Sequence, residues 1–244
     1  MKRRDEFLAW LRDRVLTLER PHPTRVAIDG FSTSGKTSLA DELAPLLEAR
    51  RRQVIRASLD NFKRPWSERH RYDRASGEGY YRNAYDCDLI RSALLEPLGP
   101  GGSRRYRSSS IDPASQQPAT GATGFATDNA VLLADGVFAF RPELNDLWDL
   151  RIFLDLDPET VLQRGADRDQ TWAGSWEAAS ELYRSRYIPS EQIYVAEVNP
   201  HMVADIVIDQ RDFENPQILS ARQRRRATPK AATGRDLERR RRRR

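Results

Sequence analysis

Apolar residues along this chain occur in two patterns, short continuous runs and stripes with a spacing of three or four. The continuous runs predict buried strands at residues 25–29, 54–59, 130–134, 152–156 and 204–208. Helices are predicted at residues 5–19, 36–50, 89–98, 158–168 and 174–187. Strands that alternate with helices indicate an α/β fold, which we expect to be a mostly parallel five-stranded sheet with helices on both faces.

The periodic pattern weakens in three parts of the chain. Residues 63–86 are polar and aromatic without a clean period, which predicts a long functional loop, and residues 103–129 are rich in Ser, Thr, Gly and Pro. The last residues have low complexity and predict disorder. We therefore expect an N-terminal helix (1–22), a main domain (23–220) and a basic tail (221–244).

The composition is sufficient to form a hydrophobic core. The 244 residues are 39% hydrophobic and 32% charged, which leaves room for one α/β domain and excludes a membrane-spanning protein. The single cysteine, Cys87, excludes a disulfide framework and a multi-cysteine zinc site. Because the N-terminal residues include no apolar signal segment, we expect a cytoplasmic protein.

The net charge of +5 is unevenly distributed. Twelve Arg or Lys and two acids lie in residues 221–244, so this tail carries +10 and the remainder of the chain carries −5. A mildly acidic main domain argues against nucleic acid as its partner, and a nucleic-acid contact is expected at most through the tail. The alternative interpretation of the tail is a solvated appendage. A homo-oligomer is compatible with the sequence, which does not fix the oligomeric state.

Residues 30–37, GFSTSGKT, match the Walker A pattern G-x-x-x-x-G-K-[ST] between a predicted strand and a predicted helix. Glycines let backbone N–H groups surround a phosphate, and the N-terminus of the following helix favours negative charge. We predict ATP and Mg²⁺ as cofactors, with Lys36 on the β- and γ-phosphates and the Thr37 hydroxyl on the metal. The predicted nucleotide-binding residues are Gly30, Phe31, Ser32, Thr33, Ser34, Gly35, Lys36, Thr37 and Ser38.

Two aspartates follow predicted strands, at the edge where α/β sheets bind ligands. Asp135 ends VLLAD and is the candidate second acid of the magnesium site, although strand-end acids that only face solvent are also common. Asp60 ends the second strand and is the candidate base for an acceptor hydroxyl. Its alternative role is that of a turn or helix-capping aspartate.

The remaining chemistry favours a small-molecule kinase over a switch GTPase or a motor, because no guanine-reading Asn-Lys-x-Asp and no LSGGQ motif occurs. Arg164 and Arg168, spaced i and i+4, are predicted to belong to a helical lid that closes over the phosphates. Arg186, further along the chain, is predicted to bind the substrate. Alternatively, Arg164 and Arg168 only pair with nearby acids on the surface. Candidate acceptor residues are Tyr72, Tyr80, Tyr81, Asn83, Tyr85 and Asp86, unless these tyrosines merely pack the loop.

The ordered series GFSTSGKT, SLDNF, NAYDCDLI, VLLADGVF and DLDPETVLQRGADRD, followed by RYIPSEQIY and ADIVID, resembles the uridine kinase family within the phosphoribulokinase and uridine kinase group. The resemblance covers about residues 25–216 and implies a P-loop NTPase fold. It implies that Asp60 is the catalytic base, that Tyr106 belongs to the base pocket, and that the loop at 209–216 borders the adenine of ATP. Arg164 and Arg168 resemble lid arginines.

Departures from the family pattern concern the acceptor. Asn61 and Lys63 replace the second acid and the tyrosine of an Asp-Asp-Phe-Tyr motif, and Asn83 stands where the family tends to have an acid on the ribose. We expect an ATP-dependent kinase whose acceptor is the 5′-hydroxyl of uridine or cytidine. The alternatives are a kinase for a non-nucleoside metabolite, such as a sugar phosphate or a pantothenate-like acid, and a nucleotide-binding regulatory protein.

Overall fold

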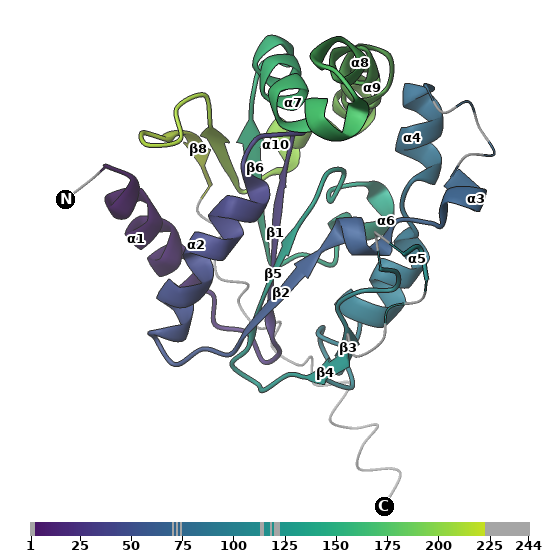
Figure 1. Ribbon diagram of the computed structural model, residues 1–244. Coiled ribbons are helices and arrows are strands. Elements are labelled where there is room, and N and C mark those ends of the chain that lie inside the picture. Colours follow the sequence, from purple (N-terminus) through teal and green to yellow (C-terminus); the bar gives the residue numbers. More distant parts are fainter. Residues whose placement is uncertain are drawn as a thin grey trace, which may run out of the picture.

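The computed structural model describes residues 3–69, 71, 73, 75–112, 115–117, 119 and 123–222. Within these residues, six strands form one sheet in the order β2-β5-β1-β6-β7-β8, and two short strands form a separate hairpin (Figure 1). The strands of the sheet are β1 (Thr24–Gly30), β2 (Val54–Ser58), β5 (Val131–Asp135), β6 (Leu150–Asp155), β7 (Ile206–Asp209) and β8 (Gln217–Ala221). The hairpin consists of β3 (Arg105–Arg107) and β4 (Thr123–Phe125).

The five predicted strands and the mostly parallel sheet are confirmed, but the strand count was one too low. β2, β5, β1, β6 and β7 are parallel neighbours, whereas β8 pairs antiparallel with β7 at the sheet edge. Four of the five β8 residues are exposed, so this strand lacks the continuous apolar run that marks buried parallel strands. The predicted tail begins at Ala221, the last residue of β8, and its residues 223–244 lie outside the described part of the chain.

Helices and helical turns cover the sheet on both faces and at its carboxyl end (Figure 1). Near the amino end of the chain they are α1 (Arg3–Leu16), α2 (Lys36–Glu48), η1 (Leu59–Phe62), α3 (Trp66–Arg69), α4 (Gly77–Asn83), α5 (Cys87–Leu89) and η2 (Ile90–Leu95). The later ones are α6 (Pro142–Asn145), α7 (Pro158–Ala173), α8 (Trp176–Leu182), η3 (Tyr183–Tyr187), α9 (Ile188–Val198) and α10 (Pro200–Val203). Among the described residues, no helix is both long and apolar enough to cross a membrane.

Successive side chains of the central strands point to opposite faces of the sheet, and each face has its own hydrophobic cluster. Val26 and Ile28 of β1 pack with α1 and α2, whereas Ala27 faces a second cluster built with α4, η2, α6 and α9. β5 repeats this alternation, with Leu133 on the α1–α2 side and Leu132 on the other. Because both faces are covered, β1 and β5 are buried along their whole length, and their carboxyl ends are held at one edge of the sheet.

The segment 63–86 is more ordered than its sequence pattern indicates. The expectation of one long loop was wrong here, because α3 and α4 form within it. The Ser76 side chain caps α4 by accepting a hydrogen bond from the Gly79 N–H at 3.0 Å. A Cβ on Gly77 would lie 2.7 Å from Pro189 of α9, so this glycine permits the close packing of the two helices. Tertiary contact therefore stabilises a helix that has no amphipathic stripe of its own.

Candidate active site

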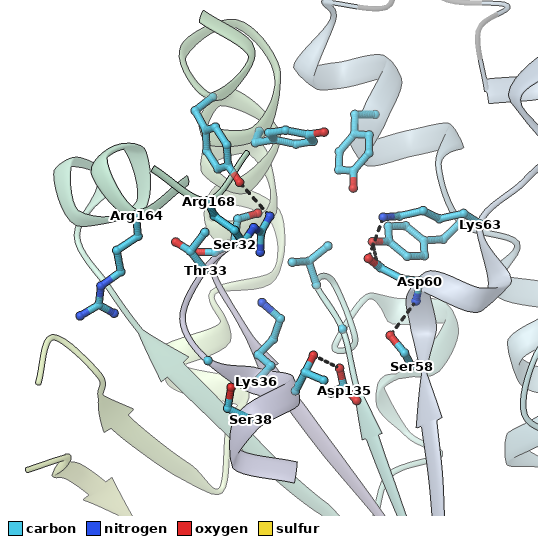
Figure 2. Close-up of a pocket in the computed structure, with 18 of the residues that line it drawn as sticks. Ser32, Thr33, Lys36, Ser38, Ser58, Asp60, Lys63, Asp135, Arg164 and Arg168 are labelled. Carbon is cyan, nitrogen blue, oxygen red and sulfur yellow. Dashed lines mark hydrogen bonds and ion pairs between the residues drawn. The ribbon is translucent and has the colours of Figure 1, made fainter. Parts of the chain in front are cut away.

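A cavity of about 570 Å³ lies at the carboxyl end of the sheet, where residues of α7 and η3 line one side of it (Figure 2). The loop between β1 and α2 forms one wall, and η1 with α4 forms the opposite wall. Its lining residues are Ser32, Thr33, Gly35, Lys36, Thr37, Ser38, Ser58, Asp60, Lys63, Tyr80, Tyr85, Asp135, Gly136, Val137, Arg164, Asp167, Arg168, Tyr183, Tyr187 and Phe213. The Walker A loop and both strand-end aspartates thus share one cavity.

The Walker A loop adopts a tightly turned backbone that depends on its glycines. Gly35, with φ of 83°, caps α2 in the left-handed conformation, and no side chain accepts a hydrogen bond at this helix start. A Cβ on Gly30 would lie 2.5 Å from the Leu154 carbonyl oxygen, and one on Gly35 would lie 2.3 Å from the Phe213 ring. The loop therefore leaves backbone N–H groups of the helix N-terminus facing the cavity, which is suited to a phosphate.

Lys36 is held by the loop that precedes it. Its Nζ donates to the carbonyl oxygens of Gly30 at 3.1 Å and Phe31 at 2.7 Å. Burial lowers the pKa of Lys36, while the carboxylates of Glu191 and Asp29 oppose this shift. The Lys36 side chain projects into the cavity in Figure 2.

Asp135 and Thr37 face each other at the base of the cavity. The Thr37 hydroxyl donates to Asp135 Oδ2 at 2.7 Å, and Arg56 contacts Asp135 Oδ1 at 3.0 Å and Asp41 at 2.9 Å. Asp135 is only 2% exposed, so its pairing with Arg56 offsets part of the cost of burying its charge. The two oxygen-bearing side chains predicted for magnesium are therefore brought together, within an arrangement that fixes their orientation.

Asp60 lies on the opposite side of the cavity, in the turn η1 that follows β2. Its carboxylate accepts a hydrogen bond from the Tyr85 hydroxyl at 2.6 Å and forms an ion pair with Lys63 at 2.9 Å. The side chain is 53% exposed and points into the cavity (Figure 2). Burial raises the pKa of Asp60, but the positive charge of Lys63 and the Tyr85 hydrogen bond outweigh it and lower the pKa overall. This carboxylate is therefore ionised, and Lys63 and Tyr85 fix its orientation towards the cavity.

Both predicted lid arginines line the cavity, each held by neighbours. Arg164 donates to the carbonyl oxygens of Gln210 at 3.0 Å and Arg211 at 2.7 Å, and its guanidinium lies 4.5 Å from the Phe213 ring centre. Arg168 pairs with Asp169 at 2.7 Å, as the surface-pair interpretation expected. Even so, 63% of the Arg168 side chain remains exposed at the cavity edge.

Three residues predicted for the acceptor lie outside the cavity lining. Tyr81 is 1% exposed and packs in the core below the guanidinium of Arg141, 4.9 Å away. The Asn83 amide donates to the Glu68 carbonyl oxygen at 3.0 Å, and Asp86 caps α5 by accepting from the Leu89 N–H at 3.0 Å. Because α4 is a helix and not a loop, it turns Tyr81 inward while Tyr80 reaches the cavity.

Tyr80 and Tyr85 line the cavity as predicted, whereas two further acceptor candidates, Tyr106 and Arg186, also lie outside its lining. Tyr106 of β3 packs over Gly124 and lines a separate hollow between the hairpin and η2. Arg186 lies behind the cavity lining, with its guanidinium 4.6 Å from the Tyr80 ring centre and 5.6 Å from that of Tyr187. Tyr72 is outside the described residues.

Glu191, which contacts the Walker A loop from outside the cavity lining, was missed by sequence reasoning. Glu191 of α9 is 5% exposed and accepts a hydrogen bond from the Ser32 N–H of the Walker A loop at 2.5 Å. Burial raises the pKa of Glu191 to about 7. Phe213 packs on the same loop, and its carbonyl oxygen accepts a hydrogen bond from Arg4 of α1. These contacts join segments more than 150 residues apart, so no local pattern could indicate them.

The β1–loop–α2 unit, with Thr37 and Asp135 at one strand edge, defines the class of nucleotide-binding P-loop proteins of the kinase type. The chain belongs to the phosphoribulokinase / uridine kinase family, whose family model matches residues 26–213. The family indicated by the sequence motifs is thus confirmed.

Individual relatives agree with this assignment. The chain is 30% identical over 194 residues to uridine-cytidine kinase B of Dictyostelium discoideum, covering 79% of this chain and 76% of that protein. It is 33% identical over 184 residues to a thymidylate kinase of Xanthomonas campestris, covering 71% and 74%. A solved structure described as a possible uridine kinase from Bacillus stearothermophilus superposes with a TM-score of 0.66 at 20% identity, over 83% of this chain and 97% of that one.

Proposed function

We propose that this protein is an ATP-dependent kinase that transfers the γ-phosphoryl group to a hydroxyl of a small molecule. The observation that carries the proposal is the placement of an ionised, cavity-facing Asp60 across one cavity from the Walker A loop. A phosphate-binding loop alone serves many activities, whereas a fixed base opposite it is what phosphoryl transfer to an alcohol needs. Membership of a family with uridine-cytidine kinases supports this reading.

ATP would be held through its phosphates. Backbone N–H groups of the Walker A loop and the Lys36 ammonium group would bind the β- and γ-phosphates, and the glycine positions leave no Cβ in the way. Thr37 and Asp135 fit a magnesium site, because both present oxygen atoms at the cavity base and hydrogen-bond to each other. When bound, Mg²⁺ offsets phosphate charge during transfer.

In the transfer step, the acceptor hydroxyl oxygen forms a bond to the γ-phosphorus while the bond to the β–γ bridging oxygen breaks. Asp60 takes the hydroxyl proton, and ADP leaves with its new negative charge. Lys63 and the Tyr85 hydroxyl hold the Asp60 carboxylate in place. Arg164 and Arg168 at the cavity edge would neutralise the transferring group and exclude water when the lid closes.

The acceptor is proposed on the family relationship. Uridine and cytidine are the acceptors in the name of the Dictyostelium relative, so their 5′-hydroxyl is the first candidate, whereas the Xanthomonas relative is named for thymidylate. A second candidate is a non-nucleoside metabolite. It is favoured by the cation Lys63 next to Asp60 and by Asn83, whose amide is engaged with the backbone of α3.

A coupled ADP-release assay tests the proposal. Purified protein with MgATP is offered uridine, cytidine, other nucleosides, ribulose 5-phosphate and pantothenate, each at several concentrations. Acceptor-dependent ADP release by the wild type, abolished in Asp60→Asn, is the expected result. ATP binding without acceptor-dependent ADP release from any compound would instead favour the nucleotide-binding regulatory protein.

A further inference from the structure

Behind the acceptor side of the cavity, two arginines have no acidic partner among the residues that the structure describes. We propose that the acceptor carries an anionic group, a carboxylate or a phosphate, and that Arg186 and Arg69 bind it next to Tyr80. The proposal rests on the proposed kinase function and specifies its substrate class. It favours the non-nucleoside or otherwise charged acceptors over uridine and cytidine.

Arg186 is the first half of this anion site. It is 9% exposed, and no described residue forms a hydrogen bond or an ion pair with its guanidinium. Its Nε is buried without a partner, and its contacts are the faces of Tyr80 and Tyr187, both of which line the cavity. Buried arginines are nearly always paired, so an unpaired one beside a cavity indicates that a ligand supplies the negative charge.

Arg69, the last residue of α3, is the second half. Within the described part of the chain, its Nε is also buried without a partner, and the one hydrogen bond of its side chain is a long one of 3.4 Å to Gln116. Burial lowers the pKa of Arg69, and the neighbouring positive charge of Arg186 lowers it further, against the effect of Tyr80. A bound anion would offset the charge of both guanidinium groups.

The other charged residues of the cavity do not neutralise the positive charges of Arg69 and Arg186. Lys63 is neutralised by Asp60 at 2.9 Å, and Arg168 is neutralised by Asp169 at 2.7 Å. In the described part of the chain, no carboxylate lies within ion-pair distance of Arg69 or Arg186. An uncharged nucleoside could hydrogen-bond to them but could not balance their charge. A carboxylate or phosphate does both, in the two-pronged geometry that guanidinium groups favour.

The position of the pair also fits an acceptor. Tyr80 contacts residues on both sides of the proposed site. Arg186 stacks on the Tyr80 ring. The Lys63 ammonium group, which forms the ion pair with Asp60, lies 5.8 Å from the centre of the same ring. Arg186 contacts the rings of Tyr80 and Tyr187, and both tyrosines line the cavity that also holds Asp60, so an acceptor anchored at Arg186 would lie against the acceptor wall of that cavity. The anion is a positioning contact, and the bond-making step is unchanged.

Matched acceptor pairs test the inference. Pantothenate is compared with its alcohol panthenol, and ribulose 5-phosphate with ribulose, with uridine and cytidine as uncharged nucleosides. We expect the charged member of at least one pair to have a kcat/KM tenfold or more above its uncharged partner and above both nucleosides. A preference within the pantothenate pair would indicate a carboxylate as the bound anion, and a preference within the ribulose 5-phosphate pair would indicate a phosphate. An uncharged compound as the best acceptor would overturn the inference while leaving the kinase function intact.

Variants locate the effect. Arg186→Gln and Arg69→Gln should each raise the KM of the charged acceptor by about 10- to 100-fold, the size of a lost charged hydrogen bond, with the KM of ATP within twofold of wild type. Arg186→Lys should recover part of the loss. Arg184→Gln, which removes an exposed charge from the same turn η3, is the matched control and should change neither constant. Unchanged KM values in both Gln variants, with normal melting temperatures, would contradict the proposal.

A binding measurement keeps the two proposals separate. Pantothenate, panthenol, ribulose 5-phosphate and ribulose are titrated calorimetrically into the MgADP-bound protein and into Arg186→Gln. Arg186-dependent binding of a charged compound without turnover would support the anion site and count against the kinase function. Absence of Arg186-dependent binding for all of them would overturn the anion site, whatever the turnover assay shows.

Discussion

The two walls of the cavity are built in different ways. The nucleotide wall comes from one continuous segment, residues 30–38, in which backbone groups and two glycines define the shape. The acceptor wall is assembled from η1, α4 and η3, which are distant in sequence and contribute side chains: Asp60, Lys63, Tyr80 and Tyr187. A wall made of backbone tolerates little change, whereas a wall of side chains can accommodate a new substrate by single substitutions.

The contrast between the walls is tested most strongly at Asp60. Asp60→Asn keeps the size of the side chain but removes the proton acceptor, so kcat should fall by about 10²–10⁴-fold while the affinity for MgATP stays within twofold. Steady-state kinetics and ATP titration measure the two quantities. Asp88→Asn, an exposed acid outside the cavity lining, serves as the control. The wild-type pH profile should also retain an ionised base in mildly acidic solution, because the pKa of Asp60 is lowered, mainly by Lys63 against the effect of burial.

Lys36→Met tests the nucleotide wall. The substitution keeps an unbranched apolar stem and removes the charge on the phosphates, so kcat should fall by about 10²–10³-fold for every acceptor alike. The acceptor Kd, measured by calorimetry, should stay near the wild-type value. If Lys36→Met instead altered the preference among acceptors, the separation of the two walls would be wrong.

Asp135→Asn tests whether the Asp135 carboxylate contributes to magnesium binding. Removing the charge from the Thr37 partner should raise the Mg²⁺ concentration for half-maximal activity by about 10- to 100-fold. Arg56 loses an ion pair in this variant, so Asp41→Asn, which removes the other acidic partner of Arg56, is the matched control. The control should leave the magnesium dependence unchanged. An equal shift in both variants would assign the effect to Arg56.

The smallest expected effect is a pH dependence of stability at Glu191. In the folded protein burial raises its pKa to about 7 from an ordinary value of 4.5, so the folded state binds the proton more tightly than the unfolded state. The free energy of unfolding should therefore fall as the pH rises from about 4.5 to about 7. Urea titrations at several pH values should show a shallower fall for Glu191→Gln. Part of the fall should remain, because burial also raises the pKa of Asp29, to about 6.

The difference between the walls also explains what the sequence could predict. Five buried strands and the Walker A loop have local signatures, and Thr37 and Asp135 follow from the rule that parallel strands end at one edge. Tyr81 and Tyr80 are adjacent in sequence, and only the packing of α4 on α9 decides that Tyr80 faces the cavity. Arg69 and Glu191 carry no local signal at all, because their importance arises from neighbours distant in the chain.

The account depends on the fate of the γ-phosphoryl group, which ³¹P NMR follows directly. The wild-type protein is incubated with MgATP and the best acceptor of the panel, and the phosphorus-containing products are quantified. The account predicts one new phosphomonoester for each ADP formed, with neither product accumulating in Asp60→Asn. Formation of ADP together with inorganic phosphate alone, at the same rate with and without an acceptor, would contradict it.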